Sequence, residues 1–332
     1  MEKIAFYAEA NKKIGIGHLV RLKNIQKRIK NKKIIWFFSG DKKFADKILK
    51  KNYYYLNKKN SSKIVSSFDK ILKKEKITKI FLDIANQTNL KKKKLFENFF
   101  KILKKNKYFL ISFDDPRLKI FSDISIIPYL FDKKKITIIN KKATLLHGKK
   151  YFFSSSYFDS YRGKKKIIKK NVKKIFIFLT GYNKKKVIKK FLKEFAYTNY
   201  QILIYAEGLK IKNNNKNIKL IGFKKNIAKL YFGSDISIVG EGLSRYEASL
   251  LGVPTVLIYT FENLRKTNDL AWKFINLNTS KLFKGKFGFN NLKIFLEKVM
   301  TYKTRLKLSK NAAKNFDLNG FRRIINRIEK YS

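Results

Sequence analysis

The sequence predicts an α/β protein made of two doubly wound domains, and three observations lead to this fold class. Apolar runs of strand length alternate with lysine-rich segments of helical period, which is the pattern of βαβ units around a parallel sheet. This series occurs once in each half of the chain. The length of 332 residues also matches two domains of ordinary size.

In the first half, we expect strands over the apolar runs 4–8, 34–38, 80–83 and 109–113. Helices are expected after His18, near Ala45, after Ser67 and after Leu90. The N-terminal domain is therefore predicted to span residues 1–160. A lysine-rich stretch with Gly163, residues 161–171, is predicted to be a linker.

In the second half, strands are expected at 175–179, 202–206, 218–221, 236–239 and 255–259. They define a C-terminal domain over residues 172–318. Residues 319–332 are predicted to form a helix that packs back on the N-terminal domain. We expect the two halves to share an architecture without a repeat at the level of residues. Two such domains that face each other leave an interdomain cleft at the carboxyl ends of their strands, where ligands bind.

The charge of the chain is extreme. There are 79 Lys plus Arg against 23 Asp plus Glu, a net charge of +56 that would attract nucleic acid or an anionic membrane. Only ten of the 79 are arginine, the residue that phosphate-reading proteins favour, and the lysines are spread along the whole chain. Solvated faces are the preferred interpretation, and a non-enzymatic lysine-rich nucleic-acid or membrane-surface binder is kept as an alternative.

Cysteine is absent, which excludes disulfides and thiolate metal sites and favours a reducing compartment. No apolar run reaches the ~18 residues that a membrane span needs. We therefore expect a cytoplasmic protein with neither a metal nor a cofactor. Of the two histidines, His147 stands beside Gly148 in an expected loop and is predicted to be structural.

The first loop joins the first strand to an amphipathic helix and carries Gly15, Gly17 and His18. Two glycines in this turn allow a sharp bend and a close approach to a ligand, although a dinucleotide fingerprint would need a third. The positive end of the helix dipole disfavours an imidazolium at His18, so a neutral ring that accepts a proton is expected. The alternative is that His18 only caps or packs under the helix.

The second loop, residues 240–254, follows a predicted strand and leads into another helix. Its glycines and the helix start could cradle a diphosphate over residues 242–245. The same segment contains Ser244 and Glu247 at the spacing of a capping box, which would need no ligand. Spacing alone leaves these two interpretations open.

With both loops described, the chain resembles the GT-B nucleotide-sugar enzymes, and most closely the UDP-sugar hydrolase family of pseudaminic acid synthesis, including the spore-coat SpsG-like proteins. The segments that carry the resemblance are 14–18 with Arg21, 113–115, 148–151, 226–230 and 240–254. The resemblance implies two Rossmann-like domains. The first would carry the general base and bind the sugar or acceptor, and the second would bind the nucleotide. It also implies that His18 is the general base and that Glu247 contacts the ribose.

The chain departs from the family at several positions. Where the family has a tyrosine after the third strand, residues 84–87 read Ile-Ala-Asn-Gln. The family's Gly-Gly-x-Asp-like turn is replaced by Thr-Gly-Tyr-Asn at 180–183. At the position of the family's arginine after the Gly-x-x-Tyr segment, this chain has serines at 154–156. The family's Asn-Gln pair is replaced by Glu262 and Asn263. The departures imply that substrate contacts have changed.

The resemblance implies a nucleotide-sugar hydrolase that cleaves a UDP-linked deoxy or amino sugar at the anomeric carbon, in nonulosonic acid or surface polysaccharide synthesis. A GT-B glycosyltransferase with a UDP-sugar donor is the alternative. The residues predicted to act in catalysis are His18 and Asp114, although Asp114 and Asp115 before Pro116 are equally compatible with a turn. The residues predicted to bind substrate or nucleotide are Gly15, Gly17, Arg21, Asp115, Gly181, Gly242, Ser244, Glu247 and Asn263.

Overall fold

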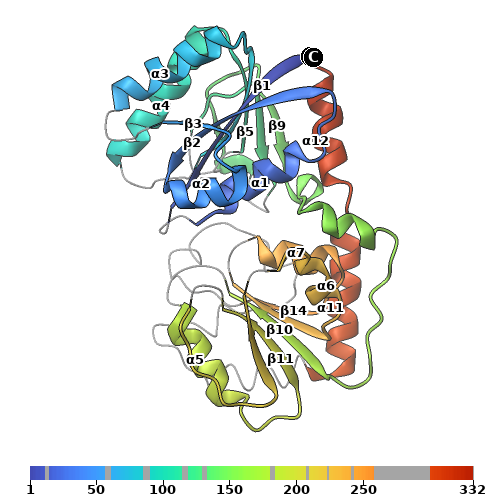
Figure 1. The fold of residues 1–332 in the computed structure, drawn as a ribbon. Coiled ribbons are helices and arrows are strands. Elements are labelled where there is room, and N and C mark those ends of the chain that lie inside the picture. The colour runs from blue at the N-terminus through green and yellow to red at the C-terminus, as the bar shows by residue number, and fades with distance from the viewer. Residues whose placement is uncertain are drawn as a thin grey trace. The chain divides into compact units, whose positions relative to one another are not determined.

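The computed structural model describes the chain except for residues 12–14, 57–60, 85–89, 114–118, 129–132, 180–183, 207–208, 223, 241–242, 258–299 and 332. It divides into two compact units (Figure 1). Unit 1 comprises Met1–Pro128, Asp132–Ser156 and Phe321–Ser332, and unit 2 comprises Tyr129–Phe131 and Tyr157–Gly320. Both are α/β, as the sequence predicts.

Unit 1 is built on a seven-stranded parallel sheet with the order β3-β2-β1-β4-β5-β7-β9. Its strands are β1 (Glu2–Ala10), β2 (Lys32–Gly40), β3 (Tyr54–Tyr55), β4 (Lys79–Asp83), β5 (Phe109–Phe113), β7 (Ile124–Ile127) and β9 (Thr144–His147). The order runs one way from β1 through β3 and the other way from β4, so the topological switch point lies between β1 and β4. A short separate sheet pairs β6 (Lys119–Ile120) with β8 (Thr137–Ile138).

Helices cover both faces of this sheet (Figure 1). One face packs against α1 (Gly17–Gln26), α2 (Lys42–Leu49) and α12 (Gly320–Glu329). The other packs against α3 (Ser61–Lys74) and α4 (Leu90–Lys105). Because both faces are covered, the central strands are apolar on both sides, which explains why the run in β1 is nearly continuous instead of alternating.

Unit 2 has a five-stranded parallel sheet with the order β12-β11-β10-β13-β14. Its strands are β10 (Lys174–Phe178), β11 (Gln201–Tyr205), β12 (Ile218–Ile221), β13 (Ile236–Val239) and β14 (Thr255–Leu257). Its helices are α5 (Lys184–Glu194), α6 (Ile227–Phe232), α7 (Ser244–Leu250) and α11 (Tyr302–Asn315). The order repeats the Rossmann pattern, with a second switch point between β10 and β13.

The segment 161–171, expected to be a linker, belongs to unit 2 and is held there. The guanidinium of Arg305, which is fully buried, donates to the carbonyl oxygens of Lys169 at 2.8 Å and Lys170 at 2.7 Å. The ammonium of Lys166 donates to the carbonyl of Phe232 at 2.6 Å, at the end of α6. The lysine-rich composition of 161–171 therefore does not distinguish a linker from a segment that packs on unit 2.

The chain contains one short residue-level repeat, contrary to the expectation from the sequence. Ser-Asp-Ile-Ser-Ile occurs at 122–126 and again at 234–238, at the starts of β7 and β13. In each copy the aspartate accepts backbone N–H groups from the start of a neighbouring strand, Leu110 at 2.8 Å for Asp123, and Lys173 and Lys174 at 2.8 and 2.9 Å for Asp235. The two strands occupy different positions in their sheets. What the copies share is therefore the local anchoring of a neighbouring strand by the aspartate.

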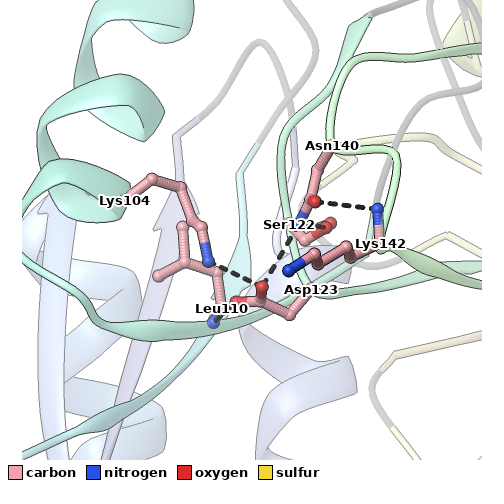
Figure 2. Close-up of polar contacts among 6 residues, drawn as sticks. All are labelled: Lys104, Leu110, Ser122, Asp123, Asn140 and Lys142. Carbon is pink, nitrogen blue, oxygen red and sulfur yellow. Dashed lines mark hydrogen bonds and ion pairs between the residues drawn. The ribbon is translucent and has the colours of Figure 1, made fainter.

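Figure 2 shows the first copy in detail. One oxygen of Asp123 accepts from the Lys104 ammonium at 2.6 Å and from the Asn140 amide at 3.2 Å. Asn140 also donates to the carbonyl of Ser122 and accepts from the N–H of Lys142. The network joins α4, the start of β5 and the loop before β9.

Within the described parts of the chain, every helix is too short or too polar to cross a bilayer. His147, expected in a loop, ends β9.

We predict that Asp123→Ala lowers the free energy of unfolding by about 2 kcal/mol, because it leaves the Leu110 N–H and two side-chain donors without their shared acceptor. Urea denaturation followed by circular dichroism measures this. Glu329→Ala, which removes an exposed carboxylate of the same unit, should stay within about 0.5 kcal/mol of wild type. Equal effects of the two substitutions would contradict the role given to Asp123.

Candidate active site at the carboxyl ends of β1 and β4

The candidate site lies in unit 1 at the topological switch point. The loop after β1 leads into α1, and β4, the neighbour of β1, ends at Asp83. Loops leave in opposite directions at a switch point, which opens space for a ligand. The side chains there are therefore the first candidates for chemistry.

Three side chains form a hydrogen-bonded group at this point. The Nδ1 atom of His18 lies 2.7 Å from Oδ1 of Asp83. Arg21 donates from Nε to Oδ2 and from Nη2 to Oδ1 of the same carboxylate, both at 2.6 Å. His18 and Arg21 are three residues apart on α1, so they project from the same side of the helix toward β4.

The carboxylate of Asp83 is fully buried, whereas the His18 side chain is 25% exposed. Burial alone would raise the pKa of Asp83, but the charge of Arg21 and the bonds from Arg21 and His18 outweigh it, so this pKa lies below its ordinary value of 3.8. Asp83 is thus ionised at neutral pH and accepts hydrogen bonds only. The contact with His18 then requires a proton on Nδ1.

This tautomer leaves Nε2 as the ring nitrogen with a free lone pair. A histidine held in this way by a buried carboxylate can remove a proton from water or a hydroxyl, and the ionised Asp83 stabilises the imidazolium that results. This geometry is compatible with the base role of His18, which remains a prediction. In front of His18, the N–H of Gly15 donates to the carbonyl of Asn11 at 2.8 Å.

The two glycines of this loop differ in their reason for being glycine. Gly15 has a φ of +76°, a conformation that side chains disfavour. Gly17 begins α1 with an ordinary backbone, and a Cβ added there would meet no atom within 4 Å. Among the described residues, packing thus gives no reason for glycine at position 17. Contact with a ligand, as predicted for Gly17, remains a prediction.

Asp83 is the site residue that the sequence analysis missed. Asp114, predicted to act in catalysis, and Asp115, predicted to bind substrate, lie outside the described residues. In the described part of the chain, the carboxylate that contacts His18 is that of Asp83. A signal was present, because Asp83 is an acidic residue that ends an otherwise apolar strand. In a Rossmann order that strand lies next to β1, so its last residue faces the first loop.

In unit 2, the second loop leads from β13 into α7. The capping-box interpretation is wrong. The N-cap position of α7 is Leu243, whose side chain makes no capping hydrogen bond. The Ser244 hydroxyl donates instead to the carbonyl of Gly240 at 3.4 Å. Glu247 is partly buried near Tyr231, whose pKa is raised well above its ordinary value by burial and by this carboxylate. Helix capping therefore does not explain Glu247.

The remaining predicted site residues Gly181, Gly242 and Asn263 lie outside the described residues. Arg21, predicted to touch substrate, is 9% exposed and directs its fork at Asp83. In the described part of the chain, no group of three or more acidic or histidine side chains is arranged to hold a metal ion.

The chain was compared with known proteins. No protein-family model matches it. An uncharacterized protein of Methanocaldococcus jannaschii is 26% identical over 313 residues, a match that covers 86% of this chain and 61% of that relative. The chain thus spans somewhat less than two thirds of the length of this relative.

Solved structures resemble the whole chain. MurG of Acinetobacter baumannii superposes with a TM-score of 0.66 at 12% identity, covering 99% of this chain and all of that one. The chain has the GT-B fold. The glycotransferase of kitacinnamycin gives a TM-score of 0.61 at 8% identity, over 99% and 98% of the two chains. UDP-GlcNAc 2-epimerase from Neisseria meningitidis, solved with UDP-GlcNAc, gives 0.57 at 14% identity, over 99% and 100%.

We predict that Asp83→Asn lowers the free energy of unfolding by about 3 kcal/mol at pH 7, because it removes the charge that Arg21 neutralises. The pKa of Asp83 is lower in the folded protein than in the unfolded chain, so its stabilisation is complete above pH ~5 and is lost as the pH falls below ~4. Urea titrations at pH 7 and pH 3.5 should give a smaller difference between variant and wild type at the lower pH. A difference independent of pH would contradict this.

Proposed function

We propose that the protein processes a UDP-sugar at its anomeric carbon with His18 as general base, and that hydrolysis to free sugar and UDP is its activity. One observation carries this proposal: His18 and Asp83 pair at the switch point of a GT-B unit, with Nε2 of the imidazole left to accept a proton. The resemblance of the loops to the hydrolases of pseudaminic acid synthesis supports hydrolysis and a deoxy or amino sugar.

The proposed step needs few groups. A water oxygen attacks the anomeric carbon while Nε2 of His18 takes the water proton. The bond from that carbon to the diphosphate oxygen breaks, and UDP leaves with the electron pair. A nucleoside diphosphate leaves readily once its charge is neutralised, so the carboxylic acid that protonates an ordinary leaving group is not required. The buried Asp83 carboxylate stabilises the imidazolium that forms.

The nucleotide is assigned to unit 2. Glu247 stands on α7 directly after β13, at the second switch point, and by the family resemblance it binds the ribose. The epimerase with the same fold was solved with UDP-GlcNAc, which supports a UDP-linked ligand. Glycosyl transfer is the alternative, supported by the similarity to the glycotransferase. His18 would then deprotonate an acceptor hydroxyl instead of water. A nucleic-acid or membrane binder, suggested by the charge of +56, remains the non-enzymatic alternative.

We predict that UDP binds in calorimetric titration and that Glu247→Ala weakens binding about 10-fold or more, since a charged hydrogen bond contributes about 1.5–3 kcal/mol. Glu194→Ala, an exposed carboxylate on α5 of the same unit, is the matched control and should bind UDP like wild type. If wild-type protein did not bind UDP or another nucleoside diphosphate, the proposed function would be wrong.

We predict that UDP is released from UDP-sugars without any acceptor, and that His18→Ala lowers kcat by about 10²–10⁴-fold with little change in KM, the usual loss when a general base is removed. His147→Gln alters the other histidine of the chain and should keep full activity. UDP release that depends strictly on an added sugar or lipid acceptor would favour transfer. Equal rates for His18→Ala and wild type would remove His18 from the mechanism.

A further inference from the structure

The position of Arg21 is unusual for a residue expected to bind substrate. Its side chain is 9% exposed, and its guanidinium engages both oxygens of Asp83 at 2.6 Å. The Cζ atom lies 4.5 Å from the centre of the Phe113 ring at the end of β5. The guanidinium plane is therefore fixed from two directions, by a carboxylate on β4 and by an aromatic ring on the next strand.

We propose that Arg21 is a positioning residue that acts through Asp83: its fork holds the carboxylate in one orientation and in its charged form, so that Oδ1 accepts the Nδ1 proton of His18 and Nε2 stays available. The inference rests on the proposed role of His18 as base. It assigns Arg21 to the catalytic histidine and not to the substrate.

The carboxylate of Asp83 is fully buried. A buried carboxylate without a cation takes up a proton, because its charged form has lost its hydration. Protonated Asp83 would carry an O–H that donates to Nδ1, and the ring proton would then sit on Nε2. In that tautomer Nε2 has no lone pair, and His18 cannot act as a base. The positive charge of Arg21 thus determines which ring nitrogen is free.

Arg21 is the arginine or lysine that neutralises the charge of Asp83 in the described part of the chain. Among the described residues, the charged or titratable groups that act on Asp83 are Arg21 and His18, both from α1. On the side of β1, its register partner is Ala8, and on the side of β5 the aromatic ring of Phe113 packs on Arg21. Neither β1 nor β5 supplies a second cation there.

Substitutions of Arg21 can test the effect of its charge separately from the effect of its shape. A guanidinium presents two parallel donors that match a carboxylate, whereas a lysine ammonium is a point charge. Arg21→Lys keeps the charge and loses the fork. Arg21→Met loses both, and Arg21→Gln keeps an N–H donor without the charge.

Because the chain has only two histidines, nitrogen NMR of protein labelled with ¹⁵N-histidine can test the inference without substrate. His147→Gln assigns the His18 signals. At pH 8 we expect wild type to carry its proton on Nδ1. Arg21→Met and Arg21→Gln should shift His18 to the form with the proton on Nε2, and Arg21→Lys should largely retain the wild-type form.

Arg28→Met is the matched control. Arg28 follows α1 closely, donates to the carbonyl of Ser154 at 2.7 Å and stacks 4.9 Å from the Phe321 ring, so its loss removes a comparable arginine of unit 1 without touching Asp83. It should leave the His18 signals unchanged. In kinetics with a UDP-sugar, Arg21→Met should lower kcat about 10²-fold or more with little change in KM. The acid limb of its pH profile should move to higher pH, because Asp83 then takes up a proton more readily.

The outcomes are distinct. Should Arg21→Gln and Arg21→Met keep the proton on Nδ1 and the wild-type pH profile, Arg21 would be structural only and the inference would be wrong. A wild-type His18 with its proton on Nε2 would also overturn it. If the NMR results are as expected but no nucleotide sugar is bound or turned over, the proposed function fails while the assignment of Arg21 stands.

Discussion

A carboxylate excluded from water, Asp83, is the constraint on which the candidate site depends. Arg21 meets both of its oxygens and His18 contacts one of them, and these contacts keep it charged. An ionised Asp83 accepts hydrogen bonds only, so its contact with His18 requires a proton on Nδ1. Two of the three groups stand one turn apart on α1, and the third ends the adjacent strand. Secondary structure alone thus brings them together, with no long loop needed.

The parallel sheets explain why the site lies where it does. In both units the strand order changes direction beside the first strand, and in both the described candidates stand next to that change: His18 and Asp83 between β1 and β4, Glu247 after β13. The aspartates of the repeated Ser-Asp-Ile-Ser-Ile segments lie at the other edge, where strands begin. The candidate site residues lie at the carboxyl ends of the strands, and the two anchoring aspartates lie at the amino ends.

Much of this could be predicted from the residues. The apolar runs of β5, β12 and β13 match their predicted bounds, because buried parallel strands leave a continuous apolar signal. The strand β7 was missed although its sequence is as apolar and lies between Ser122-Asp123 and Pro128. His18 could be predicted from its glycine loop. Asp83 could not be predicted from local sequence, because its significance depends on which strand neighbours β1. The capping box of Ser244 failed because the helix begins at Ser244 itself, one residue too early for Ser244 to be its N-cap.

The C-terminal segment has a consequence for biosynthesis. Residues Phe321–Ser332 belong to unit 1, and Ile324 and Ile328 fill the same hydrophobic cluster as Leu19 and Phe38. A ribosome has made the whole of unit 2 before this segment emerges. Until then the α1 face of the first sheet is incomplete, so unit 1 is expected to mature last, although its first strand is synthesised first.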